Sequence, residues 1–155
     1  MVKTVEAVWE DETIKVYVAG PLTSSGSVAA NIKQASDMGF ELMKWGHSPY
    51  VPHVMYIWEC FSDDFAGEYE RWMELDFSWL SVCDALIRLP GESKGADREV
   101  EYANKNFIRV FHTLWDFLRW ADELEMKAEG PTLLNDQGQD ITKEMTDLLK
   151  RSCRD

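Results

Sequence analysis

The chain has 155 residues, the length of one ordinary domain, and 45% of them are hydrophobic, enough for a buried core. Lys and Arg number 16 against 28 Asp and Glu, so the formal charge is −12, which argues against a nucleic-acid polymer or an anionic membrane as partner. Three cysteines without a CxxC pair favour reduced thiols over a disulfide or zinc framework. With no apolar run of membrane-spanning length and an N-terminus too acidic for a signal peptide, we expect a soluble, cytoplasmic protein.

The first third of the chain predicts a strand followed by a helix. Residues 14–19, IKVYVA, are apolar and rich in β-branched side chains and predict a buried strand, ended by Gly20. A small, hydroxyl-rich loop follows, and apolar residues at spacings of three and four predict a helix over residues 28–45. Residues 1–13 fit either an edge strand or an arm onto a partner subunit.

The middle of the chain is less regular. Residues 47–53, HSPYVPH, predict a short strand interrupted by prolines. Residues 54–67 carry several aromatic side chains and fit either a wall over a pocket or a poorly patterned helix. Residues 68–82 then predict a helix, and residues 83–89 predict a strand.

The last part predicts a helix over residues 97–106, a strand over 107–111 and a helix over 113–128. Strands that alternate with helices indicate an α/β fold, a Rossmann-like or flavodoxin-like parallel sheet flanked by helices. We expect this domain to span residues 1–128. Residues 129–155 are expected to form a C-terminal helical extension, with a linker followed by an amphipathic helix over residues 141–151.

Asp76 interrupts the apolar stripe of the helix predicted over residues 68–82. It lies four residues after Trp72 and four before Leu80. A carboxylate on such a face is desolvated, and desolvation raises its pKa. A structural Asp that caps a loop or pairs with an Arg would fit the same position.

Glu99 lies about one turn into the helix predicted over residues 97–106. There the helix macrodipole and free amides favour the ionised carboxylate, although an ordinary first-turn Glu would fit equally. Asp76 and Glu99 together would form two carboxylates with pKa values pushed apart, the pattern of acid and nucleophile in glycosyl chemistry. Tyr17, in the first strand, could orient Glu99 or simply pack in the sheet.

Two loops follow the first and third predicted strands, and ligands of parallel sheets bind at that edge. Their small and hydroxyl-bearing residues could hold a phosphate or could serve turn formation alone; they are Gly20, Thr23, Ser24, Ser93 and Gly95. The three histidines are dispersed, so we expect no metal site.

Three blocks of the sequence occur in a specific order and spacing: KVYVAGP at residues 15–21, DFSWLSVCD at 76–84 and SKGADREVEYA at 93–103. Together they resemble the nucleoside 2-deoxyribosyltransferase superfamily, especially its short phage and bacterial members. They are also similar to the branch that hydrolyses 2′-deoxynucleoside 5′-monophosphates. The resemblance covers about residues 15–110.

The resemblance implies roles for four residues. Glu99 matches the nucleophilic glutamate of the superfamily, and Asp76 matches the helix aspartate that handles the proton of the leaving base. Tyr17 matches the strand tyrosine that positions the nucleophile. Asp84 matches a strand-starting aspartate that we take as structural.

Ser93 lies six residues before Glu99, where the monophosphate hydrolases carry a phosphate-binding serine and the transferases tend to carry an aspartate. The first loop lacks the basic residue of the hydrolases, so Lys94, Arg98 or a neighbouring subunit would supply the positive charge. The resemblance thus implies an N-glycosidase that cleaves the base–sugar bond of a (deoxy)nucleoside 5′-monophosphate through a Glu nucleophile, without metal or organic cofactor.

Two other functions stay open. A nucleoside 2-deoxyribosyltransferase would use the same covalent chemistry with a second base in place of water, although its C-terminal asparagine has no clear counterpart here. A non-catalytic sensor would bind a nucleotide without turnover. In all cases we expect a small-molecule nucleoside or nucleotide as partner and a homodimer or higher homo-oligomer. Tyr56 and Trp58 are expected to stack on the base.

Overall fold

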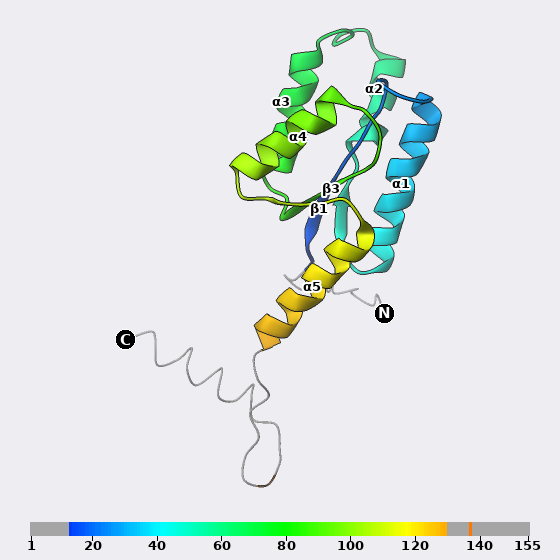
Figure 1. Cartoon of the computed structure of the whole chain (residues 1–155). Coiled ribbons are helices and arrows are strands. Elements are labelled where there is room, and N and C mark those ends of the chain that lie inside the picture. The colour runs from blue at the N-terminus through cyan, green and yellow to red at the C-terminus, as the bar shows by residue number, and fades with distance from the viewer. Residues whose placement is uncertain (1–12, 130–136, 138–155) are drawn as a thin grey trace, which may run out of the picture. The chain divides into compact units, whose positions relative to one another are not determined.

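The computed structural model describes residues 13–129 and residue 137 (Figure 1). The chain divides into two compact units, Met1–Leu118 and Arg119–Asp155, and the sheet lies in the first. The arm expected before residue 13, most of the expected linker and the helix expected at residues 141–151 lie outside the described residues.

Four parallel strands form one sheet, and the expected α/β class is confirmed. The order is β2-β1-β3-β4, so β1 and β3 occupy the centre. Tyr17 on β1 lies opposite Tyr50 on β2 and Leu86 on β3. The strands are β1 (Lys15–Ala19), β2 (Ser48–Tyr50), β3 (Ala85–Arg88) and β4 (Arg109–Phe111).

Helices connect and flank these strands (Figure 1). α3 and α4 lie against each other, and α4 also packs on the central strands. No helix among residues 13–129 is long and apolar enough to cross a membrane. The helices are α1 (Val28–Lys44), the 3-10 helix η1 (Pro52–Met55), α2 (Tyr56–Phe61), α3 (Tyr69–Leu80), α4 (Lys94–Lys105) and α5 (Leu114–Glu129).

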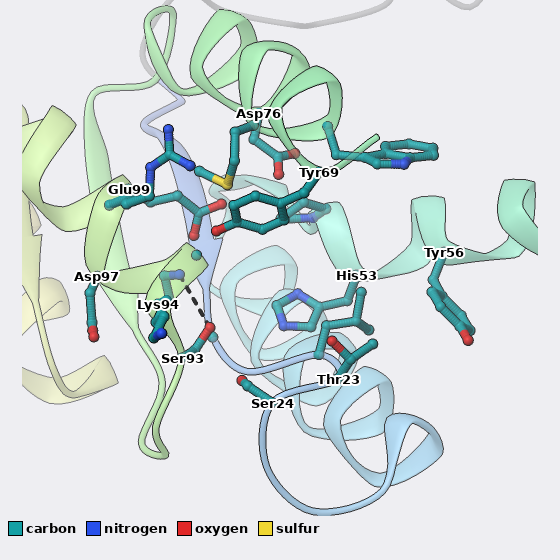
Figure 2. A pocket seen from close by; sticks show the side chains of 18 of the residues that line it. Thr23, Ser24, His53, Tyr56, Tyr69, Asp76, Ser93, Lys94, Asp97 and Glu99 are labelled. Atoms are coloured by element: carbon teal, nitrogen blue, oxygen red, sulfur yellow. Dashed lines mark hydrogen bonds between the residues drawn. The ribbon is translucent and has the colours of Figure 1, made fainter. Parts of the chain in front are cut away.

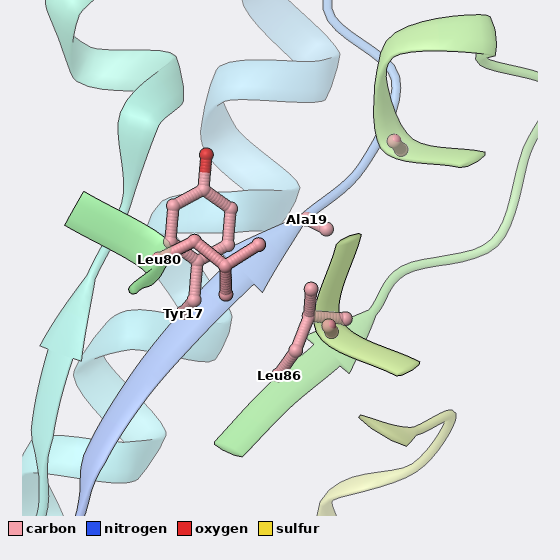
Figure 3. Close-up of a cluster of buried hydrophobic side chains, with 6 residues drawn as sticks. Tyr17, Ala19, Leu80 and Leu86 are labelled. Atoms are coloured by element: carbon pink, nitrogen blue, oxygen red, sulfur yellow. The ribbon is translucent and has the colours of Figure 1, made fainter. Parts of the chain in front are cut away.

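A buried cluster joins α3 and α4 to one face of the sheet (Figure 3). Tyr17 and Leu86 supply its large side chains from β1 and β3, and Leu80 closes it from the end of α3. Ala96 and Ala103 supply only methyl groups from α4, which lets that helix approach the strands closely. The cluster therefore fixes α4, and every side chain on its inner face, relative to β1.

The helix α4 begins three residues earlier than the sequence predicts. The Ser93 hydroxyl oxygen accepts a hydrogen bond of 3.2 Å from the Ala96 amide and caps the helix. Glu99 consequently lies in the second turn of α4. The ambiguous residues 54–67 contain the end of η1 and the short helix α2, and part of this segment lines a cavity.

Candidate functional site

A cavity of about 1200 Å³ opens where β1 and β3 end (Figure 2). Both loops expected at this edge line it, together with the first turns of α4, one face of α3 and part of η1 and α2. The volume is larger than a drug-sized ligand requires. The residues expected to bind phosphate all line the cavity; they are Gly20, Thr23, Ser24, Ser93 and Gly95.

Glu99 lines this cavity and contacts Tyr17, which is buried behind it. The Tyr17 hydroxyl donates a hydrogen bond of 2.6 Å to Glu99 Oε1. The Tyr17 side chain is fully buried and Glu99 is only 5% exposed. Because both backbones are held by the core cluster, the carboxyl group has a fixed position at the edge of the cavity.

Asp76 enters the same cavity from α3 (Figure 2). It shares its helix face with Tyr69, Trp72 and Met73, all of which line the cavity, as the apolar stripe predicts. Burial raises the pKa of Asp76 to about 6, and the Tyr17 hydroxyl partly offsets this effect. The Tyr17 hydroxyl therefore lowers the pKa of both carboxyl groups.

The electrostatic state of Glu99 is opposite to the expectation from sequence. Burial raises its pKa to about 8; the charge of Asp76 adds to the rise, while the Tyr17 hydrogen bond and Arg88 oppose it. The expected helix-terminal stabilisation is weak because Glu99 lies in the second turn, beyond the free amides. Both carboxyl groups are thus shifted upwards, and Glu99 is shifted further than Asp76.

The loops that face the carboxyl groups are tied together. The Ser24 hydroxyl donates a hydrogen bond of 2.8 Å to the backbone carbonyl of Glu92. A Cβ at Gly20 would lie 3.1 Å from Leu89 Cβ and 3.4 Å from His53 Nε2, so a small residue is needed there. The two loops therefore form a hydroxyl-lined end of the cavity.

Three basic residues line the cavity, and they differ in their partners. Arg88 donates to the carbonyls of Leu89 and Gly91 and forms an ion pair with Asp97. Arg98 makes two hydrogen bonds to a carboxylate on α3. Lys94 lies exposed in the first turn of α4, next to Ser93 (Figure 2).

The two aromatic residues expected to stack on a base lie in different places. Tyr56 lines the cavity. Trp58 does not: it lines a smaller neighbouring hollow, with its ring centroid 6.4 Å from that of Trp72. Besides Tyr56, the α3 side chains Tyr69 and Trp72 are aromatic residues that line the cavity.

A model for a family described as a domain of unknown function (DUF7768) matches residues 14–113. The chain belongs to the DUF7768 family. The DUF7768 region contains all four strands and the carboxyl groups of both Asp76 and Glu99. No curated protein matches the chain.

Two residues beside the cavity of this DUF7768 chain, His53 and Arg88, were not predicted from the sequence. His53, at the start of η1, is buried against the backbone of Gly20 and Pro21, and its burial lowers its pKa. Arg88 is the last residue of β3, and it donates hydrogen bonds to two carbonyls of the following loop. A lone charge at the end of an apolar strand was a usable signal for Arg88; no local pattern marks His53.

Two further observations bear on the expected chemistry. The Asp84 carboxylate accepts a hydrogen bond of 2.8 Å from the Lys15 amide, at the opposite end of β1 from the cavity. Among the described residues, no group of three or more His, Cys, Asp or Glu side chains could hold a metal ion. Asp76 and Glu99 both line the cavity, and burial raises the pKa of each of them.

Proposed function

We propose that this protein is an N-glycosidase that cleaves the base–sugar bond of a (deoxy)nucleoside 5′-monophosphate. The observation that carries the proposal is the buried 2.6 Å hydrogen bond between Tyr17 and Glu99, in a cavity that Asp76 shares. The resemblance of three sequence blocks to the nucleoside 2-deoxyribosyltransferase superfamily supports the same chemistry.

In the proposed reaction, an oxygen of the Glu99 carboxylate bonds to the anomeric carbon as the bond from that carbon to the base nitrogen breaks. The protonated Asp76 donates its proton to the departing base. Water then attacks the anomeric carbon, gives a proton to the ionised Asp76 and displaces Glu99. The products are the free base and the sugar phosphate.

In the free protein the higher pKa is that of Glu99, so the shared proton lies mainly on Glu99 and the proposed reaction needs its transfer to Asp76. Between pH values of about 6 and 8 the pair Asp76–Glu99 holds one proton. Positive charge that develops on the sugar favours the state in which Glu99 is ionised and Asp76 carries the proton. That state has both a nucleophile and an acid.

The hydroxyl-lined end of the cavity is the place for the 5′-phosphate. Ser93 and the amides that open α4 lie on one side, and Thr23 and Ser24 lie on the other. Lys94 supplies the positive charge that the first loop lacks. No metal or organic cofactor is needed.

A deoxyribosyltransferase is the second candidate. The cavity of about 1200 Å³ leaves room for an acceptor base beside a bound nucleotide. The Glu99-linked sugar would then be captured by that base in place of water. We expect the protein to work as a homo-oligomer in either case, which sedimentation of the purified chain would measure.

The deciding experiment is release of free base from a panel of ribo- and deoxyribonucleoside 5′-monophosphates and the matching nucleosides. Glu99→Gln should abolish release, whereas Glu101→Gln, on the exposed face of α4, should leave it intact. Lys94→Met should raise KM for monophosphates and leave nucleosides unaffected.

Three outcomes are distinct. Release by the wild type that is lost in Glu99→Gln supports the hydrolase. Exchange only with an added acceptor base supports the transferase. Tight nucleotide binding without release or exchange would contradict an enzymatic function and leave a nucleotide sensor.

A further inference from the structure

Arg98 joins the two helices that carry Asp76 and Glu99. Its guanidinium donates two hydrogen bonds, of 2.8 Å and 2.9 Å, to the two carboxylate oxygens of Glu70. Arg98 belongs to α4 and Glu70 to the first turn of α3. The planar guanidinium fork fits the carboxylate in one orientation, so the pair fixes an angle as well as a distance.

Aromatic rings extend this contact along the line where α3 meets α4. The Arg98 guanidinium carbon lies 5.5 Å from the ring centroid of Tyr69 and 5.8 Å from that of Phe77, both on α3. Phe77 in turn stacks on Tyr102 of α4, with centroids 4.7 Å apart and planes at 9°. Side chains of the two helices thus alternate, which resists sliding of one helix along the other.

This contact lies one residue away from each carboxyl group. Phe77 directly follows Asp76, and Arg98 directly precedes Glu99. Because neighbouring residues move with the same helix backbone, a slide or rotation of α3 on α4 would change the separation of Asp76 and Glu99. A displacement of about 1 Å between reacting groups can cost about a hundredfold in rate.

Because the ion pair between Arg98 and Glu70 is exposed, we expect it to affect the position of α3 on α4 more than the folding stability. The Arg98 side chain is 37% exposed and that of Glu70 is 73% exposed. Pairs in such surroundings add about 0–1 kcal/mol to folding stability. The pair matters instead for the position of α3 on α4, because it packs on the rings of Tyr69 and Phe77 beside the cavity.

We infer that Arg98 is a positioning residue, which holds α3 on α4 and thereby sets the separation of Asp76 and Glu99. Its effect on turnover rests on the proposed function; its effect on the two carboxyl groups does not. Arg98 acts through Glu70, Tyr69 and Phe77 and does not itself react.

The test compares Arg98→Met with Arg71→Met. Arg71 also lies on this part of the molecule, over the ring of Phe65, but its ion pair with Glu74 stays within α3. We expect Arg98→Met to lower kcat about 10- to 100-fold, with a small change in KM and in melting temperature. Arg71→Met should leave kcat unchanged, and Arg98→Lys, which keeps the charge without the fork, should fall between.

A second measurement does not depend on turnover. Carboxyl ¹³C NMR titration should show the Asp76 and Glu99 titrations displaced in Arg98→Met and unchanged in Arg71→Met. The other charged or titratable groups near the pair are the same in every variant; they include Tyr17 from β1, Tyr50 from β2, His53 from η1, Glu59 from α2, Arg88 from β3, and Lys94 and Asp97 from α4.

The outcomes separate the two proposals. Wild-type protein without base release or exchange would contradict the proposed function, and the NMR titrations would still decide the role of Arg98. Unchanged titrations in a folded Arg98→Met protein would overturn the positioning role, whatever the activity. If Arg98→Met does not fold, the same comparison is made with Arg98→Lys.

Discussion

Burial raises the pKa of Glu99, and the charge of Asp76, which lines the same cavity from another helix, raises it further. The two carboxyl groups therefore titrate as a pair, with one proton between them over a defined pH range. This coupling leads to a direct expectation for the pH dependence of activity.

Base release should follow a bell-shaped pH profile, with its maximum between about pH 6 and pH 8. Below about pH 6 both carboxyl groups are protonated, and the nucleophile is lost. Above about pH 8 both are ionised, and no acid is left for the departing base. Measurement of kcat/KM from pH 4 to pH 10 checks this, and a rate that keeps rising through pH 9 would contradict the role of Asp76 as an acid.

Tyr17→Phe removes the hydrogen bond to Glu99 without changing the shape of the buried ring. A hydrogen bond to a charged group contributes about 1.5–3 kcal/mol, so we expect kcat/KM to fall about 10- to 100-fold. Because the Tyr17 hydroxyl lowers the pKa of both carboxyl groups, both limbs of the pH profile should move to higher pH.

The control for this variant is Tyr50→Phe. The Tyr50 ring lies 5.6 Å from that of Tyr17, and its buried hydroxyl makes no hydrogen bond in the described part of the chain. Its removal should leave the pH profile nearly in place. Equal losses in the two variants would indicate that ring packing, not the Tyr17 hydrogen bond, matters.

Glu99→Gln should abolish turnover and stabilise the fold. The folded-state pKa of Glu99 is about 8, well above its ordinary value of 4.5, so the folded protein prefers the protonated carboxyl group. Stability therefore falls as pH rises from about 4.5 to about 8, by about 1.4 kcal/mol per pH unit at most. The neutral amide escapes this loss, so its melting temperature should exceed that of the wild type more at pH 8 than at pH 5.

Glu101→Gln provides the matched comparison for stability. Lys105 lowers the pKa of the exposed Glu101, so that carboxylate contributes to stability at neutral pH and not against it. Its replacement should lower the melting temperature slightly or leave it unchanged. A gain as large as that of Glu99→Gln would show that burial of Glu99 is not the cause.

Gly91→Ala should destabilise the protein more than Gly46→Ala. Both glycines have positive φ angles, 114° and 81°, where any Cβ adds strain of about 1–3 kcal/mol. A Cβ at Gly91 would also lie 2.9 Å from Pro21 Cγ, whereas one at Gly46 would meet nothing within 4 Å. Urea denaturation measures the difference; equal midpoints would contradict the close approach of the two loops.

The sequence predicts the two central strands well because residues 16–19 of β1 and residues 85–87 of β3 are short apolar runs. It also places Asp76 on the face of α3 that lines the cavity, because helical periodicity alone determines that face. These features can be predicted because they depend only on residues that are close in sequence.

The electrostatic state of Glu99 could not be predicted in the same way. Its burial depends on β1 and on the two short side chains Ala96 and Ala103, which let α4 approach the sheet. Trp58 likewise lies outside the cavity, in a neighbouring hollow near Trp72, and no sequence pattern marks that placement. Both results come from tertiary packing.

The loop between β3 and α4 is held from two sides. Ser24 binds the Glu92 carbonyl from the β1 loop, and Arg88 binds the Gly91 carbonyl from beneath. Its backbone is therefore ordered before any ligand arrives, and the conformational entropy of this segment is lost during folding and not during binding. Recognition at this end of the cavity should accordingly resemble a rigid fit, with association limited by encounter and not by loop closure.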